Sequence, residues 1–162
     1  MLIIEKTFPN YIDRAEELIL KTNQFKMNLN TFNRLFIKNN YKNFITLRFK
    51  DKFNDYGIVV VLYFLYEKNN LLIKNWVMSC RVFDRNIEFS VMSILKRIAI
   101  KNKCNSILID FMKSNKNLPA LLALNNIGFK KVNDSIYKIN VNKVNDSKLI
   151  KIINLNNGEM HG

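Results

Sequence analysis

The sequence predicts an α/β or α+β fold in which helices cover both faces of a mixed sheet. Near Phe44 the hydrophobic pattern changes from a helical period to alternation, which marks the passage from helices to strands. Three strand-like segments then follow one another, as in an antiparallel meander. Beyond them helical and strand-like segments alternate, which predicts a β-α-β-α-β C-terminal half.

Two helices are expected before the first strand. Residues 13–21 place apolar side chains on one helical face, at Ala15, Leu18 and Ile19. A polar stretch at residues 22–25 interrupts this pattern. A second helix is expected over residues 31–38, with Thr31 as its N-cap. Its buried face would comprise Phe32, Leu35 and Phe36.

Three strands are expected next. Residues 44–50 alternate apolar and polar side chains, as a half-buried strand does. Residues 58–66 form a nearly continuous β-branched and aromatic run, which predicts a strand covered on both faces. A third strand is expected over residues 71–83. Turn-forming residues separate the three strands, at residues 51–57 and 69–70.

The second half alternates helices with strands. Residues 87–101 predict an amphipathic helix whose apolar face comprises Val91, Ile94, Leu95, Ile98 and Ala99. A short apolar strand is expected over residues 106–111. The next helix, over residues 120–126, is closed by Gly128 as its C-cap. Residues 136–140 predict the final strand.

Length and composition indicate one globular domain. The chain has 162 residues, 48% of them hydrophobic and only 4 of them Gly, which is enough to bury a core. We expect the domain over residues 1–141 and a polar tail over residues 142–162. No apolar run reaches the roughly 18 residues of a membrane helix. The N-terminus does not resemble a signal peptide, so we expect a cytoplasmic protein without membrane contact.

The cysteine and histidine content excludes several kinds of site. Two cysteines, Cys80 and Cys104, are too few for a disulfide framework. The single histidine is His161, next to the C-terminal residue. A His-based triad or a His/Cys metal site therefore has almost no material, and we expect no metal.

The net charge of +13 is compatible with an acidic partner. The lysines are dispersed, without a dense basic run or an Arg-rich arm, which disfavours nucleic acid. An acidic protein partner is about as compatible with the net charge as a nucleic acid is. A bias toward Lys, Asn and Ile is also what an AT-rich genome produces without any functional demand.

The junction between the third strand and the long helix, residues 79–88, could bind an anion. A helix that begins there points free backbone N–H groups at the end of the strand. Arg81 and Arg85 add positive charge suited to a pyrophosphate. The alternative is a tight strand–helix turn with two solvated arginines.

The order of elements and three landmarks resemble the GNAT acyltransferase superfamily. The landmarks are the R-x-x-x-x-N junction that starts at Arg81, then Asn117, then a helix ending in G-F at residues 128–129. The superfamily binds acyl-CoA at a Q/R-x-x-G-x-G/A loop that opens its main helix. Asp84 and Asn86 occupy the two Gly positions, and both residue types tolerate left-handed backbone.

Four short blocks resemble the C-terminal domain of FkbH-like proteins more closely. They are K-T-N-Q-F at residues 21–25, D-x-F-x-D-x-G at 51–57, S-C-R-V at 79–82 with Arg85 and Glu88, and S-x-K-N at 114–117 with the later G-F. This resemblance implies transfer of a glyceryl or similar acyl unit onto an acyl carrier protein. In that family the domain usually follows a HAD-type phosphatase domain.

The resemblances imply a cofactor and partners. The cofactor would be acyl-CoA or an acyl-phosphopantetheine. The partners would be an acidic acyl carrier protein and a separate HAD-type phosphatase. This chain has no D-x-D-x-T/V motif, so we expect no phosphatase activity and either a free-standing version or a piece of a longer protein.

The junction would hold the diphosphate or phosphate of the arm, mainly through backbone amides. The cofactor-binding candidates there are Arg81, Val82, Phe83, Asp84, Arg85, Asn86 and Ile87. Asn117 matches the GNAT Asn that usually faces the arm. Alternatively, its side chain bonds local backbone at the start of a helix.

The candidate catalytic residues are Cys80, Asp55 and Glu88. Cys80 would be a nucleophile, favoured by the arginines and the helix N-terminus, or else a small buried hydrophobe. Asp55 would be a general base or a residue that shapes its turn. Glu88 would be a base or a first-turn acid that stabilises the helix dipole.

Two further observations concern the substrate. The candidate substrate-binding residues between the first two helices are Thr22, Asn23, Gln24 and Phe25, although a helix-breaking turn explains them almost as well. GNAT proteins commonly carry a Tyr proton donor where this chain has Leu124. Ser79 or Tyr137 would have to replace it, or the thiolate leaves unaided, or the domain binds without catalysing.

Three functions stay open at this point. The first is an acyltransferase that handles an acyl group on a phosphopantetheine arm. The second is a non-catalytic GNAT-like module that docks a carrier protein or a phosphatase. The third is an acetyl-CoA-dependent N-acetyltransferase that acts on an amine.

Overall fold

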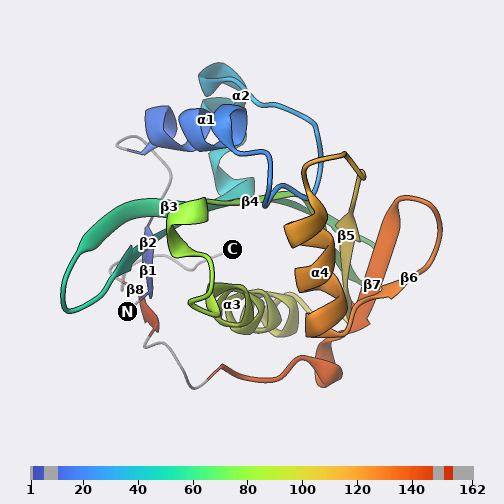
Figure 1. Cartoon of the computed structure of the whole chain (residues 1–162). Coiled ribbons are helices and arrows are strands. Elements are labelled where there is room, and N and C mark those ends of the chain that lie inside the picture. The colour runs from blue at the N-terminus through green and yellow to red at the C-terminus, as the bar shows by residue number, and fades with distance from the viewer. Residues whose placement is uncertain (1, 6–10, 148–151, 155–162) are drawn as a thin grey trace.

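The computed structural model describes residues 2–5, 11–147 and 152–154, which form a sheet with helices on both faces (Figure 1). The strands are β1 (Leu2–Glu5), β2 (Phe44–Lys50), β3 (Asp55–Glu67), β4 (Asn70–Met78), β5 (Ser106–Asp110), β6 (Lys130–Lys131), β7 (Ile136–Asn140) and β8 (Ile152–Asn154). The helices are α1 (Ile12–Lys21), α2 (Arg34–Asn39), α3 (Ile87–Lys101) and α4 (Leu118–Ile127). Single 3-10 turns are η1 (Tyr41–Asn43), η2 (Cys80–Val82) and η3 (Val141–Lys143).

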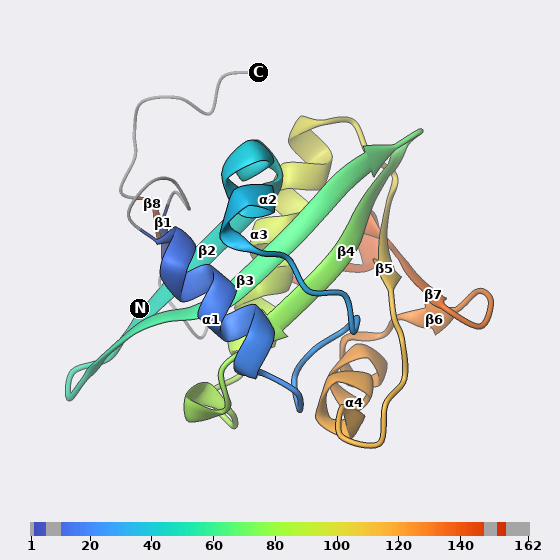
Figure 2. The same cartoon turned by 90° about the horizontal axis from the view of Figure 1, so that it is seen from above.

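The sheet is mixed, as predicted. Its strand order is β6-β7-β5-β4-β3-β2-β1-β8. Strands β1 to β4 pair antiparallel, β4 and β5 pair parallel, and β7 lies antiparallel between β5 and β6. Helices α1 and α2 lie on one face, and α3 and α4 on the other (Figures 1 and 2). The parallel pair needs a crossover, and α3 provides it.

Each face of the sheet has its own core. The core under α1 and α2 includes stacked and edge-on rings of Phe32, Phe36, Phe44 and Tyr63. The larger core under α3 and α4 is centred on the buried Trp76. Burial of these side chains on both faces supplies most of the stabilisation of such a fold.

The second helix begins later than the sequence predicted. Its N-cap is Asn33, whose Oδ1 accepts the Phe36 N–H at 2.9 Å, so the expected cap at Thr31 is wrong. The later start changes which side chains face inward. Leu35 is 61% exposed, and Ile37 is buried in its place.

The third strand ends earlier than the sequence predicted. β4 stops at Met78, and Ser79 starts the turn η2 by accepting the Arg81 N–H at 3.4 Å through its side chain. A strand as far as Phe83 is therefore wrong. Cys80 belongs to a turn, which removes it from the apolar surroundings of a central strand.

The C-terminal part of the described chain joins the domain. Strand β8 pairs parallel with β1 at the sheet edge, and Val144 is buried in the larger core. The Ser147 N–H donates to Ser93 Oγ of α3 at 2.6 Å. The segment expected to be a polar tail thus contributes a strand and a buried side chain. Residues 148–151 and 155–162 of that segment, His161 included, lie outside the described residues.

Candidate functional site

A pocket of about 370 Å³ lies between α1, the loop after α1 and the β4–α3 junction. Its lining is formed by Arg14, Glu17, Leu18 and Lys21 of α1, by Thr22, Asn23, Gln24 and Phe25, and by Met78, Ser79, Cys80, Arg81 and Phe83. Residues 22–25 and the first part of the junction, which the sequence proposed separately, therefore line one hollow. The other predicted junction residues are not in its lining: Val82 and Ile87 are buried in the core, and Asp84, Arg85 and Asn86 lie outside the pocket. A more open hollow of about 510 Å³ near Cys104 contains none of the predicted site residues.

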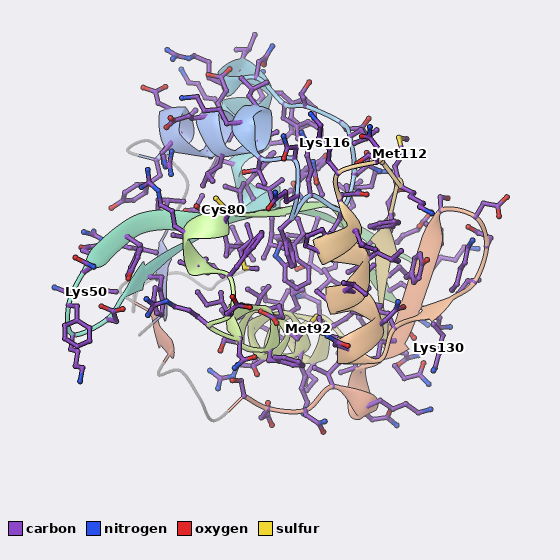
Figure 3. All side chains as sticks on the ribbon, viewed as in Figure 1. Lys50, Cys80, Met92, Met112, Lys116 and Lys130 are labelled. Atoms are coloured by element: carbon purple, nitrogen blue, oxygen red, sulfur yellow. The ribbon has the colours of Figure 1, made fainter. Side chains whose placement is uncertain are left out.

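Cys80 is exposed and lines this pocket, so it is not the buried hydrophobe of the alternative interpretation. It lies on η2, with α1 above it in Figure 3. Cys104, by contrast, is buried, and burial raises the pKa of its thiol. Of the two thiols, Cys80 is therefore the more accessible to a substrate.

The junction after η2 adopts the backbone that the two missing glycines would favour. Asp84 has φ of 63° and Asn86 has φ of 56°, both in the left-handed region. Asn86 is the N-cap of α3, and its side chain makes no capping hydrogen bond. The first N–H groups of α3 are therefore not used by that side chain, which suits an anion at this end.

The two arginines of the junction differ in availability. Arg81 is exposed, and its guanidinium has no ion pair or hydrogen bond to any described residue. Arg85 binds Asp51 through Nη1 at 2.6 Å and donates to Tyr56 Oη at 2.8 Å. Its guanidinium also lies over the rings of Phe49 and Tyr56. Arg81 is the cation available to a ligand, and Arg85 ties the junction to the β2–β3 hairpin.

Asp55 also belongs to the hairpin and does not line the pocket. It pairs with Arg48 and accepts the Gly57 N–H at 3.0 Å. The Arg48 guanidinium, then the Gly57 N–H, hold the pKa of Asp55 at about 2. A carboxylate so stabilised in its ionised form is a weak base, and this arrangement favours the turn-shaping role.

Asp51 shapes the same turn by accepting the backbone N–H groups of Asn54 and Phe53, each at 2.8 Å. These bonds, that of Asn54 first, and the Arg85 ion pair lower the pKa of Asp51. Glu88 lies in the first turn of α3 and does not line the pocket. Its position fits the stabilisation of the helix dipole.

Asn117 is buried and fully engaged with backbone. Its Nδ2 donates to the carbonyls of Lys26 and Met112, each at 2.9 Å, and its Oδ1 accepts the Ser114 N–H at 2.8 Å. It does not line the pocket. The bonds to Ser114 and Met112 are to local backbone, as in the alternative interpretation, and the bond to Lys26 joins this loop to a segment 91 residues away.

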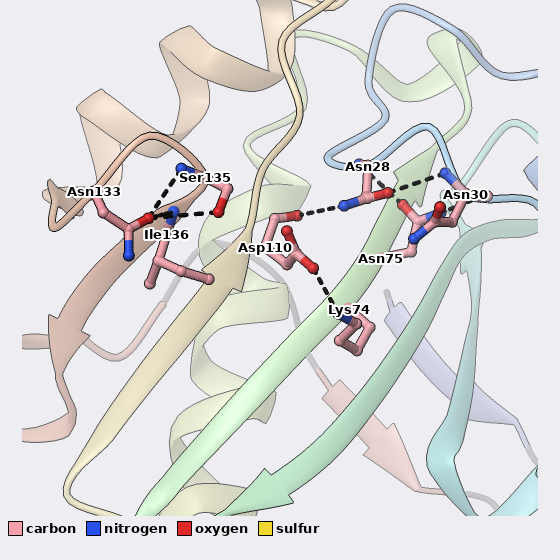
Figure 4. Close-up of polar contacts among 8 residues, drawn as sticks. All are labelled: Asn28, Asn30, Lys74, Asn75, Asp110, Asn133, Ser135 and Ile136. Atoms are coloured by element: carbon pink, nitrogen blue, oxygen red, sulfur yellow. Dashed lines mark hydrogen bonds and ion pairs between the residues drawn. The ribbon is translucent and has the colours of Figure 1, made fainter.

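Residues 25–28 fill the space where β4 and β5 separate. The two strands pair only as far as Ile73 and Ile109. Beyond that point the Met27 N–H donates to the Trp76 carbonyl and the Met78 N–H to the Phe25 carbonyl, each at 3.0 Å. The residues around this fork, including the Lys74–Asp110 ion pair of 2.6 Å, appear in Figure 4.

Lys26 fixes the end of α1 from inside. Its Nζ donates to the Ile19 carbonyl at 2.7 Å, and the side chain is buried. Burial lowers the pKa of Lys26. The position of the pocket-lining residues 22–25 is therefore fixed on both sides, by this bond and by the pairing with β4.

The α1 side of the pocket is what the sequence interpretation missed. Glu17 binds Arg14 at 2.6 Å and Lys21 at 2.8 Å, and these hydrogen bonds, that of Lys21 first, hold its pKa at about 2. Arg14, Glu17, Leu18 and Lys21 are spaced i, i+3, i+4 and i+7, which places them on one helical face. That spacing was the signal available in the sequence.

The position of the usual GNAT Tyr is occupied by Leu124, which cannot donate a proton. Leu124 is fully buried, and Tyr137 is buried against Phe111. Of the two suggested substitutes only Ser79 lines the pocket. The described residues also contain no group of three or more potential metal ligands and no helix long and apolar enough to span a membrane.

Solved structures with the same arrangement of elements decide the fold. Ard1 from Thermoplasma volcanium superposes with a TM-score of 0.67 at 9% identity, over 86% of this chain and 97% of that one. The ribosomal-protein-S18-alanine N-acetyltransferase from Escherichia coli gives 0.63 at 10% identity, over 87% and 94%. A GNAT-family acetyltransferase from Staphylococcus aureus Mu50 gives 0.65 at 15% identity, over 87% and 99%. The chain has the GNAT fold.

These likenesses concern the arrangement of elements, since the identities are 15% or less. No family model matches the chain, and no curated protein matches it either. The narrower resemblance to FkbH-like proteins stays a prediction.

Proposed function

We propose that this chain is an acyltransferase that handles an acyl group carried on a phosphopantetheine arm, either of a carrier protein or of CoA. The observation that carries the proposal is the pocket, which joins residues 22–25 to the exposed Cys80 and to Arg81 on a GNAT fold. The Arg81 guanidinium has no partner within the described part of the chain. The structural neighbours named above are acetyltransferases. Another neighbour, N-acetylglutamate synthase from Neisseria gonorrhoeae, was solved with coenzyme A.

The pocket supports a covalent route through Cys80. The Cys80 thiol gives its proton to solvent, and its thiolate attacks the thioester carbonyl. A new S–C bond to Cys80 forms, the S–C bond to the arm breaks, and the arm leaves as a thiolate that takes up a proton from solvent. An acceptor then attacks the new thioester and releases the Cys80 thiol. The Arg81 guanidinium and the N-terminus of α3 would bind the phosphates of the arm.

The experiment combines calorimetry with mass spectrometry. The protein is titrated with acetyl-CoA and with a pantetheinylated acidic carrier protein, and binding to neither would overturn the proposal. Incubation with an acylated carrier should add one acyl mass to the wild type and to Cys104→Ala, but not to Cys80→Ser. Normal transfer by Cys80→Ser would exclude the covalent route and leave direct transfer.

A second candidate is a non-catalytic GNAT-like module that docks a carrier protein or a separate HAD-type phosphatase. The observation that favours it is the buried Leu124 in place of a proton donor. Binding of the holo carrier without any turnover would select it. A third candidate is an acetyl-CoA-dependent N-acetyltransferase, which the names of the neighbours favour. Turnover of acetyl-CoA with an amine acceptor would select it.

A further inference from the structure

The start of α4 and the loop before it form an exposed surface with apolar and basic side chains. We call it the α4 surface, and it comprises Met112, Lys113, Lys116, Leu118 and Leu122. The apolar members are 46%, 58% and 51% exposed, for Met112, Leu118 and Leu122. Leu118 and Leu122 are one helical turn apart and share a face. Met112 and Lys116 lie on the loop that leads into α4 (Figure 3).

The charge of this region has one sign. No Asp or Glu occurs between Phe111 and Asn133, where the chain has four lysines. Lys113 and Lys116 are exposed and have no ion pair within the described residues. On α1 the situation is the opposite, because Glu17 pairs with both Arg14 and Lys21. The α4 surface therefore offers exposed lysines without an ion pair in the described residues, on the loop that leads into a helix with exposed leucines.

The α4 surface is fixed to the wall of the pocket. Met112 donates its N–H to the Met27 carbonyl at 2.9 Å, and Asn117 donates to the Lys26 carbonyl. Phe25, next to Lys26 in the chain, lines the pocket. The segment from Phe25 to Met27 therefore connects the α4 surface to the pocket that contains Cys80.

We infer that the α4 surface docks an acidic carrier domain, whose arm then enters the pocket. This inference rests on the proposed function. Apolar side chains inside a charged rim are the usual composition of a protein–protein interface. The lysines would meet carboxylates on the carrier, and Leu118 and Leu122 would bury against an apolar helix face. A nucleic acid would use the lysines but leave the two leucines exposed to water.

The test measures binding of an acidic acyl carrier protein, in apo and holo forms, to the full chain. The double variant Lys113→Glu/Lys116→Glu should raise Kd by roughly tenfold or more, and by less at high salt. Leu122→Ser should raise it by about tenfold as well. The matched controls lie on α2 and η1, where Lys38→Glu/Lys42→Glu and Leu35→Ser change residues of the same type and should leave Kd within about twofold.

The outcomes separate this inference from the proposed function. Equal effects of the α4 variants and the controls, or no binding of either carrier form, would overturn the inference. So would stronger binding of a DNA duplex than of the carrier through the same lysines. Transfer from a free acyl-pantetheine thioester would keep the proposed function in those cases. Carrier binding that depends on the α4 surface, without transfer from any thioester, would keep the docking site and refute the transferase.

Discussion

The pocket and the β2–β3 hairpin both contain residues from the motifs that resemble FkbH-like proteins, yet they differ in how those residues are used. In the hairpin Asp51 and Asp55 each bind an arginine and backbone N–H groups. At the pocket Cys80 is exposed and the Arg81 guanidinium has no partner among the described residues. A motif residue whose hydrogen bonds are satisfied stabilises the fold, whereas an unsatisfied one at a pocket is available to a ligand.

The comparison extends to Asn117, which behaves like the hairpin residues despite its motif position. Replacement by Ala removes the partner of two carbonyls and one N–H, in one buried and two partly buried hydrogen bonds. We expect Asn117→Ala to lower the free energy of unfolding by about 2–4 kcal/mol. Chemical denaturation measures this, with the exposed Asn115→Ala as the control. A stable Asn117→Ala variant with weakened arm binding would instead assign the residue to the ligand.

The two arginines of the junction give the most direct contrast. Arg81→Ala should weaken binding of CoA about tenfold, because a charge-assisted phosphate contact is lost, and should leave stability within about 0.5 kcal/mol. Arg85→Ala should lower the free energy of unfolding and leave CoA binding nearly unchanged, since it removes the ion pair to Asp51 and the ring contacts. Calorimetry and denaturation on both variants check this. If Arg85→Ala loses the affinity instead, the assignment of the two roles is wrong.

The left-handed residues of the junction test whether a phosphate comes close to the chain. Asp84→Gly and Asn86→Gly should each stabilise the fold by about 0.5–1 kcal/mol, because Gly adopts positive φ without a steric penalty. Lys68 has φ of 53° and is the matched control, since it lies in the β3–β4 turn. All three changes should raise stability. Asp84→Gly should also strengthen CoA binding, because it removes a negative charge as well as a Cβ. Asn86→Gly removes only a Cβ and should strengthen binding less; an equal gain from Lys68→Gly would contradict the site.

The sequence was sufficient for most of the fold. Periodicity located the strands β2, β3, β5 and β7 and the helix α3, because these elements bury continuous faces. It missed β1, β6 and β8, which have four residues or fewer and depend on their neighbours for pairing. Tertiary context also moved the start of α2, where the choice between Thr31 and Asn33 is not settled by cap preference alone.

The site was predicted less completely, for a physical reason. Sequence identifies Cys80 and Arg81 as candidates but not whether another residue already binds them. Arg85 and Arg81 have the same side chain, and the contacts of Arg85 with Asp51, 34 residues earlier, and with Tyr56 distinguish them. The wall of the pocket formed by α1 could have been predicted from the sequence, because its residues follow a regular helical spacing. The engagement of Asn117 with Lys26, 91 residues away, could not have been.

Replacement of Asp55 is expected to have the smallest effect on transfer, and it tests whether the hairpin takes part in the reaction. Its carboxyl has a pKa of about 2 in the fold, below its ordinary value of 3.8, chiefly because of Arg48. The stability that this shift contributes is fully present above pH 3.8 and is lost as the pH falls through about 2. At neutral pH Asp55 is ionised whether or not a substrate is bound, and Asp55→Asn should keep the transfer rate within about twofold. The measurement is the pH–rate profile of both proteins. A rate that falls by a hundredfold in Asp55→Asn, with its acidic limb removed, would make Asp55 the base and place the hairpin in the reaction.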